Sequence, residues 1–160
     1  KAIKQLKNHH ETNNHIHTDV DCYISTLIPQ DYVEDIFLRL EIYNDISNAK
    51  NDYDINHIVS KLEDVYGPIP DYLKNLFSLT RVKIEGNRIK ADKIKINKEN
   101  TVITLNPKSL IDNDKLINHY VLKNKIKLTD QYNLKYQNIS KDNFCELCEE
   151  VISMMKDISD

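Results

Sequence analysis

The order in which two hydrophobic periodicities follow each other is the strongest constraint on how this chain folds. Apolar residues recur at the helical spacing of about 3.6 through most of residues 31–91. The alternation typical of strands occurs once before that stretch, at residues 20–24, and then mainly after it, from residue 93. Because strands and helices do not alternate regularly, the pattern predicts an α+β fold, with amphipathic helices packed on a small mixed or antiparallel sheet.

A first helix is expected from Asp31, which resembles the start of a capping box because Glu34 follows three residues later. The apolar side chains spaced along this helix are predicted to form one core-facing stripe. They are Val33, Ile36, Phe37, Leu40, Tyr43, Ile46 and Ala49.

Two more helices are predicted before the later strands. Asp54 is the expected N-cap of the first. This helix ends at Gly67 and Pro68, because glycine accepts the left-handed C′ conformation and proline cannot continue a helix. Pro70 suits the first turn of the second. That helix is expected to continue through Gly86, at a cost of about 1 kcal/mol relative to alanine.

The rest of the chain predicts a hairpin, a helix, two short strands and a final helix. The hairpin covers residues 94–105, with its turn at 97–100. The elements after it are a helix near 116–121 that starts at Asp112 or Asn113, strands at 126–128 and 132–136, and a helix capped by Ser140.

A length of 160 residues is one domain's worth of chain. In residues 1–18, apolar residues at helical spacing give way to a polar stretch without periodicity. We therefore expect these residues to be the end of an upstream helix plus a polar linker, and residues 19–160 to form a single domain. The chain does not begin with methionine, which leads us to expect a piece of a longer protein.

Composition argues against several classes of function. The two glycines are too far apart for a P-loop and too few for a dinucleotide fingerprint, so no cofactor site is expected in this chain. A net charge of −3 argues against a dedicated polyanion binder. No apolar run approaches the roughly 20 residues of a membrane-spanning helix, and no signal peptide is apparent. We therefore expect a cytoplasmic location without membrane contact.

The cysteines and histidines favour a structural interpretation. Cys145 and Cys148 form a C-x-x-C motif, but it falls inside a predicted helix and lacks two further ligands for zinc. Free cysteine often serves as a small core residue. A solvated linker is likewise preferred over chance metal chelation for the early histidines, His9, His10, His15 and His17. No catalytic or metal-ligating residue is predicted.

A basic stretch supplies the alternative function. Between positions 83 and 98 the chain carries Lys83, Arg88, Lys90, Lys93, Lys95 and Lys98. Such residues can contact phosphates, but no aromatic residue interleaves with them to stack on bases. A solvated outer face is the preferred interpretation, and a nucleic-acid-contacting module that uses the Lys83–Lys98 face is the alternative.

Two longer sequence blocks are more specific signals of a protein family than the short motifs described above. Residues 27–49 read LIPQDYVEDIFLRLEIYNDISNA, and residues 61–70 read KLEDVYGPIP. They resemble the blocks L-x-P-x-D-Y-x-x-D-x-x-x-R-L-x-x-Y-x-x-I-x-x-A and E-L-x-D-R-[FY]-G-x-x-P of the C-terminal domain of bacterial transcription-repair coupling factors, the Mfd family. The resemblance is close from about residue 20 to 85 and is one of pattern beyond that.

The resemblance implies a large parent protein that is an ATP-driven translocase of double-stranded DNA. Such proteins displace stalled RNA polymerase and recruit the excision-repair protein UvrA. Their ATP and magnesium act in motor domains outside this chain. The C-terminal domain of the family is a non-catalytic regulatory module, which docks on the parent's own UvrA-binding module and masks it.

In this family the docking charges fall within the second block, so the resemblance implies partner-binding residues at Lys61, Asp64 and Val65. Of these, only Asp64 matches the family. Lys61 stands where the family has an acid, and Val65 stands where it has an arginine. Asn44-Asp45 also replaces a basic pair that often follows the tyrosine of the first block. Two interpretations stay open: a docking surface with altered contacts, and a parent protein without the partner module.

Overall fold

The structure, a computed structural model, describes residues 17–130 and 132–160. The upstream helix end and linker expected at residues 1–18 fall almost wholly outside the described residues. The elements in chain order are β1 (Asp19–Cys22), α2 (Ile36–Ser47), α3 (Asp52–Tyr66), α4 (Asp71–Ile89), β2 (Ala91–Ile96), β3 (Asn100–Leu105), α5 (Asn113–Leu116), the π-helix η1 (Ile117–Val121), β4 (Ile126–Leu128), β5 (Asn133–Gln137) and α6 (Phe144–Ile158).

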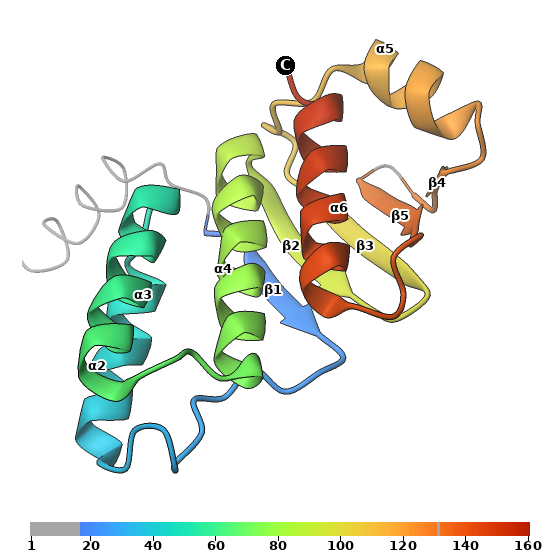
Figure 1. Ribbon diagram of the computed structural model, residues 1–160. Helices are drawn as coiled ribbons and strands as arrows, with labels where there is room; N and C mark the ends of the chain where they lie inside the picture. Colours follow the sequence, from blue (N-terminus) through green and yellow to red (C-terminus); the bar gives the residue numbers. More distant parts are fainter. Residues whose placement is uncertain (1–16, 131) are drawn as a thin grey trace, which may run out of the picture.

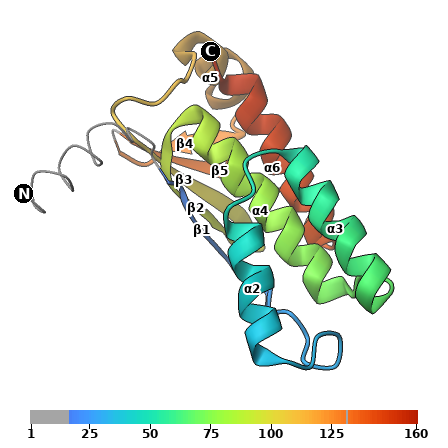
Figure 2. The ribbon, with the colours of Figure 1, turned by 90° about the vertical axis from the view of Figure 1, so that its left-hand side faces the viewer.

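The strands form one 5-stranded sheet in the order β1-β2-β3-β5-β4. β1 lies parallel to β2, and the other neighbours are antiparallel, so the sheet is mixed. Helices α4 and α6 pack against each other on one face of the sheet (Figure 1 and Figure 2). The predicted α+β fold is confirmed, and the expected hairpin and the two later short strands are present. No helix in the described residues is long and apolar enough to cross a membrane.

Two apolar clusters stabilise the fold and meet at α4. The larger cluster lies between the sheet and the helices α4 and α6, and it includes Ile103 of β3 and Leu147 of α6. The smaller cluster joins α2, α3 and the first half of α4, and it includes Ile55 of α3. Within α4, Phe77 belongs to the smaller cluster and Val82 to the larger one. This helix therefore connects the α2–α3 pair to the sheet.

The starts of α2 and α3 differ from the prediction. α2 is capped by Asp35 and not by Asp31, because residues 29–33 first close a turn in which two backbone N–H groups donate to the carbonyl of residue 29. α3 is capped by Asn51, whose side chain accepts the backbone N–H of Asp54 at 2.9 Å. Both predicted caps are wrong by three or four residues, although both helices exist. Of the two candidates for the start of α5, Asp112 and Asn113, Asp112 is the N-cap.

The predictions at the glycines and at Pro70 agree more closely with the structure. Gly67 ends α3 with φ of 90°, and Pro70 directly precedes α4. α4 continues through Gly86 as expected. A Cβ atom at Gly86 would lie 2.8 Å from Thr18 Cγ2 and 2.9 Å from Ile94 Cδ1, so only glycine allows this close approach of α4 to the sheet.

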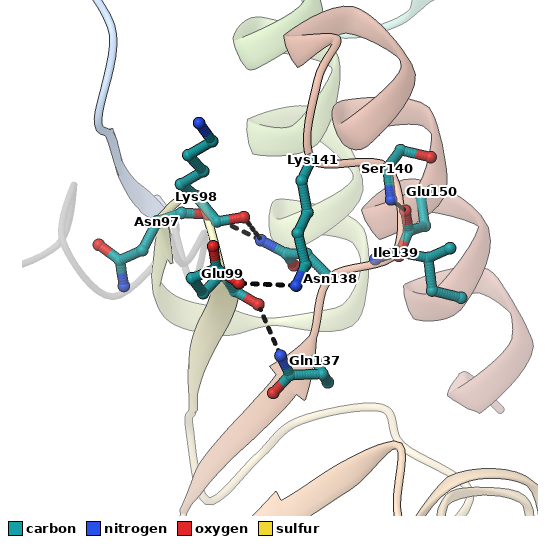
Figure 3. A network of polar contacts seen from close by, with 9 residues as sticks. All are labelled: Asn97, Lys98, Glu99, Gln137, Asn138, Ile139, Ser140, Lys141 and Glu150. Atoms are coloured by element: carbon teal, nitrogen blue, oxygen red, sulfur yellow. Dashed lines mark hydrogen bonds and ion pairs between the residues drawn. The ribbon is translucent and has the colours of Figure 1, made fainter.

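A polar network ties the β2–β3 turn to the loop that leads into α6 (Figure 3). The side-chain amide of Asn138 donates to the carbonyls of Asn97 at 2.7 Å and Lys98 at 3.1 Å. Lys141 Nζ lies 2.6 Å from Glu99 Oε2. The tip of the hairpin is therefore held in place by side chains that follow β5.

Glu150 of α6 holds the other side of the same loop. Its carboxylate accepts the backbone N–H groups of Ile139 at 2.9 Å and Ser140 at 2.7 Å (Figure 3). Ser140 is therefore bound by α6 and does not cap it, which makes that prediction wrong. The N-cap is Asn143, which accepts the backbone N–H of Glu146 at 3.0 Å.

Candidate docking surface on helices α2 and α3

Helix α2 leaves the apolar residues of its first half exposed. Ile36, Phe37 and Leu40 are 56%, 76% and 57% exposed. The buried residues of α2 are Ile42 and Ile46, so the helix packs on its neighbours through its second half. The expected core-facing stripe is therefore wrong for the first half of the helix. Contiguous exposed apolar side chains of this kind are typical of protein interaction sites.

A groove of about 380 Å³ opens between α2 and α3, and its lining does not include Ile36, Phe37 or Leu40. Its apolar lining is formed by Leu38, Ile42, Ile58, Leu62 and Val65. Acidic residues also line it, namely Glu41, Asp45 and Asp54. An apolar groove between two helices is typical of sites that receive an amphipathic segment of a partner protein.

The three predicted partner-binding residues lie on α3 and are all exposed. Lys61 and Val65 are four residues apart, which places them on the same side of the helix, and both line the groove. Asp64 lies on α3 outside the groove lining. The structure therefore brings two of the three residues into one concave site, and these two depart from the family pattern.

The charge around this site is strongly one-sided. The stretch 31–71 contains ten Asp or Glu residues but only three Lys or Arg residues. Apart from Lys61, His57 and Tyr66, the ionisable side chains that line the groove are carboxylates. Since complementary potentials favour association and fix register, the surface suits a partner that offers basic groups around an apolar centre.

Signature residues of the first block hold this surface in shape. The Tyr32 hydroxyl donates to the carbonyl of Gly67 at 2.8 Å, and burial raises the pKa of Tyr32. The Tyr43 hydroxyl accepts the backbone N–H of Ile28 at 2.6 Å. Arg39 donates to the carbonyls of residues 33 and 34 at 2.7 and 2.9 Å. Helical periodicity predicted only that Tyr43 faces the core and gave Tyr32 and Arg39 no role. Their positions in the signature of the first block were the signal that could have indicated these hydrogen bonds.

The cysteines occupy positions that support their structural interpretation. Cys148 is buried in the larger cluster, and burial, followed by the neighbouring thiol of Cys145, raises its pKa. Cys145 Sγ lies 3.6 Å from Asn75 Oδ1. Within residues 17–130 and 132–160, no three His, Cys, Asp or Glu residues gather where they could hold a metal ion. His9, His10 and His15 lie outside that part of the chain.

The basic stretch of the alternative function is spread over several elements. Arg88 of α4 forms an ion pair with Glu85 of the same helix. The other members are Lys83 on α4, Lys90 at its end, Lys93 and Lys95 on β2, and Lys98 in the following turn. The stretch is therefore divided between a helix, a strand and a turn.

The family model of the TRCF domain matches residues 22–116, which is more than half of the chain and includes α2 and α3. The chain belongs to the TRCF domain family. A relative of this TRCF domain is the transcription-repair-coupling factor of Buchnera aphidicola subsp. Acyrthosiphon pisum, which is 26% identical over 141 residues. That match covers 88% of this chain and 17% of the relative.

A second relative of the TRCF domain is the transcription-repair-coupling factor of Myxococcus xanthus, 32% identical over 101 residues, or 63% of this chain and 8% of the relative. The chain thus spans less than a fifth of the length of either relative. A crystal structure of the C-terminal domain of transcription-repair coupling factor has the same fold, with a TM-score of 0.70 at 17% identity, covering 88% of this chain and 96% of that chain. The resemblance seen in the two blocks is confirmed.

Proposed function

We propose that this TRCF domain is a non-catalytic regulatory module of an ATP-dependent DNA translocase in transcription-coupled nucleotide excision repair. In this proposal, its α2–α3 surface covers the UvrA-binding module of the same protein until the parent engages stalled RNA polymerase. The observation that supports the proposal is the groove between α2 and α3 in which Lys61 and Val65 lie, together with the exposed apolar residues in the first half of α2. The relatives support it through the printed name that they share, transcription-repair-coupling factor.

Masking within one protein needs only a modest interface. A tethered domain meets its partner module at an effective concentration that can reach the millimolar range. The masked and open states are then two populations, and binding to polymerase shifts the balance toward the open one. A surface the size of this groove and the exposed apolar face of α2 is suited to such reversible docking.

The substitutions at Lys61 and Val65 change the chemistry that the partner must offer. A carboxylate suits Lys61 and an apolar side chain suits Val65, whereas basic groups suit the acids of the groove. Of the two interpretations left open by the sequence, the intact groove favours a docking surface with altered contacts.

The remaining ligands belong to the parent protein in this proposal. ATP and magnesium act in its motor domains, and RNA polymerase, UvrA and double-stranded DNA are its partners in the bacterial cytoplasm. The 160-residue chain contributes docking and has no enzymatic role.

Titration calorimetry of the chain against the UvrA-binding module of its parent, at low salt, tests the proposal. We expect measurable binding that weakens at least about tenfold in Phe37→Ala/Leu40→Ala, because buried aromatic and aliphatic anchors dominate interface energies. Both side chains are exposed in the free domain, so the double variant should fold normally.

Leu122→Ala/Ile139→Ala is the matched control. These two side chains are 70% and 72% exposed and lie outside the α2–α3 surface, so their removal should leave the affinity unchanged. No heat of binding with the unmodified chain, or equal losses in the two double variants, would count against docking through α2 and α3.

A further inference from the structure

The face of the sheet turned away from α4 and α6 carries a group of lysines. Side chains alternate between the two faces of a strand. In β2, the buried Ile94 faces the helices, whereas Lys93 and Lys95 are exposed on the other side. Lys135 of β5 and Lys127 of β4 are exposed next to buried residues in the same way. We call these four side chains the lysine face.

Strand pairing brings the lysine face together from distant parts of the chain. Lys95 lies in register with Val102 of β3, Val102 with Lys135, and Lys135 with Lys127. With neighbouring strands about 4.8 Å apart, the row is about 14 Å wide. Lys93 lies two residues before Lys95 on the same face. The order of the strands, and not the local sequence, creates this surface.

The balance of charge differs between the two ends of the row. Asp19 and Asp21 of β1 lie in register with Lys93 and Lys95 and offset their charge. Lys127 and Lys135 instead lie directly opposite each other, and like charges in such cross-strand pairs are destabilising. No carboxylate of the described sheet is in register with either of these two lysines. A local conflict of this kind is expected at sites that serve a function, here one where an external anion supplies the missing charge.

The residue types of the lysine face favour phosphate over the other anionic partners. Protein interfaces rely on aromatic residues and arginine and are depleted in lysine. Sites for single-stranded nucleic acid stack bases on aromatic side chains. The row in question has Val102 between lysines and no aromatic residue. Lysine contacts to the phosphates of a duplex need neither arginine nor aromatic side chains, and they carry no sequence information.

We propose that the lysine face contacts the phosphate backbone of double-stranded nucleic acid, as an accessory site separate from the α2–α3 docking surface. It shares Lys93 and Lys95 with the basic stretch of the sequence analysis, but adds Lys127 and Lys135 from strands more than thirty residues further on. The net charge of −3 makes this contact weak and confined to low salt.

Fluorescence anisotropy with a labelled duplex of about 20 base pairs and random sequence, starting at about 20 mM salt, tests this inference. We expect binding whose affinity falls steeply as salt is added. Lys127→Gln/Lys135→Gln should weaken it about tenfold and lower the slope of log K against log salt by about two. Lys50→Gln/Lys156→Gln is the matched control, since it removes the same charge from exposed lysines on the helical side.

A variant that gains affinity separates this effect from damage to the fold. Asp19→Asn/Asp21→Asn removes the carboxylates opposite Lys93 and Lys95 and keeps similar side-chain shapes. We expect it to bind the duplex several-fold more tightly, because the offset charge is released. A merely structural role of these residues would not produce tighter binding.

Three outcomes would overturn the inference. The first is that the chain does not bind the duplex at the lowest salt. The second is that the two lysine double variants lose the same affinity for the duplex. The third is that the chain binds a labelled polyglutamate peptide more tightly than the duplex. The last result would assign the lysine face to an acidic protein segment. None of these outcomes depends on docking through α2 and α3, so they leave the proposed function untouched.

Discussion

Glu150 is the residue on which the loop before α6 depends. Besides the two backbone N–H groups of that loop, it accepts the Tyr136 hydroxyl at 2.6 Å. Burial opposes the ionisation of Glu150. The hydrogen bonds from Tyr136 and from the backbone of Ser140 and Ile139 outweigh burial and lower its pKa below the ordinary value of 4.5. One ionised side chain therefore joins β5, the loop and α6.

Glu150→Gln is expected to lower the free energy of unfolding at pH 7 by about 1–3 kcal/mol, because hydrogen bonds to a charged acceptor are replaced by weaker ones. A lowered pKa in the folded state stabilises it above the ordinary glutamate pKa, and this stabilisation is lost as the pH falls through the folded-state value. The gap between the wild type and the variant should therefore shrink in acid. Urea unfolding at pH 7 and at about pH 3 measures this difference in the free energy of unfolding.

Glu149→Gln on the same helix is the control, because Glu149 is exposed. It should change stability by no more than about 0.5 kcal/mol. A gap between the wild type and Glu150→Gln that stays constant across this pH range would show that the carboxylate of Glu150 is not the stabilising group.

At the scale of elements, sequence periodicity predicted nearly every helix and strand but often misplaced their starts. Capping residues are frequent in this chain, so several candidates lie within one turn of each other. The backbone path decides between them. The turn at residues 29–33 makes Asp35 the N-cap of α2. The hydrogen bond from the backbone N–H of Ser140 to Glu150 keeps Ser140 from capping the N-terminus of α6. Periodicity also could not reveal that the first half of α2 is exposed, because burial depends on which parts of α2 the neighbouring helices cover.

Gly86 shows how one element constrains the approach of another. Gly86→Ala in a helix interior would ordinarily add about 1 kcal/mol of stability. Here we expect a loss of about 1–3 kcal/mol, since the new Cβ would lie under 3 Å from Thr18 and Ile94 and would push α4 away from the sheet. Thermal and urea unfolding check this expectation.

Ser78→Ala in the same helix is the control for Gly86→Ala. Ser78 is half-buried, so alanine there should be neutral or slightly stabilising through helix propensity. If Gly86→Ala were as stable as Ser78→Ala, the close packing of α4 on β2 would be disproved.

At the scale of the whole molecule, the sequence predicted the fold class and, through two signature blocks, the family. The resemblance also implied partner-binding residues at Lys61, Asp64 and Val65, and of these Lys61 and Val65 line the groove between α2 and α3. The groove that contains them could not be predicted, because its shape depends on the packing of α2 against α3. The lysine face could not be predicted from the sequence either, since Lys95 and Lys135 come to lie on the same face only through the strand order β2-β3-β5.

The most direct test of masking uses the parent protein rather than the isolated domain. Phe37→Ala/Leu40→Ala in the full-length parent should release the covered module and raise its affinity for UvrA in the absence of polymerase, because the closed population is lost. We expect an increase of at least about fivefold in a surface-binding measurement, corresponding to a coupling of about 1 kcal/mol. An affinity for UvrA equal to that of the unmodified parent would show that the α2–α3 surface masks nothing.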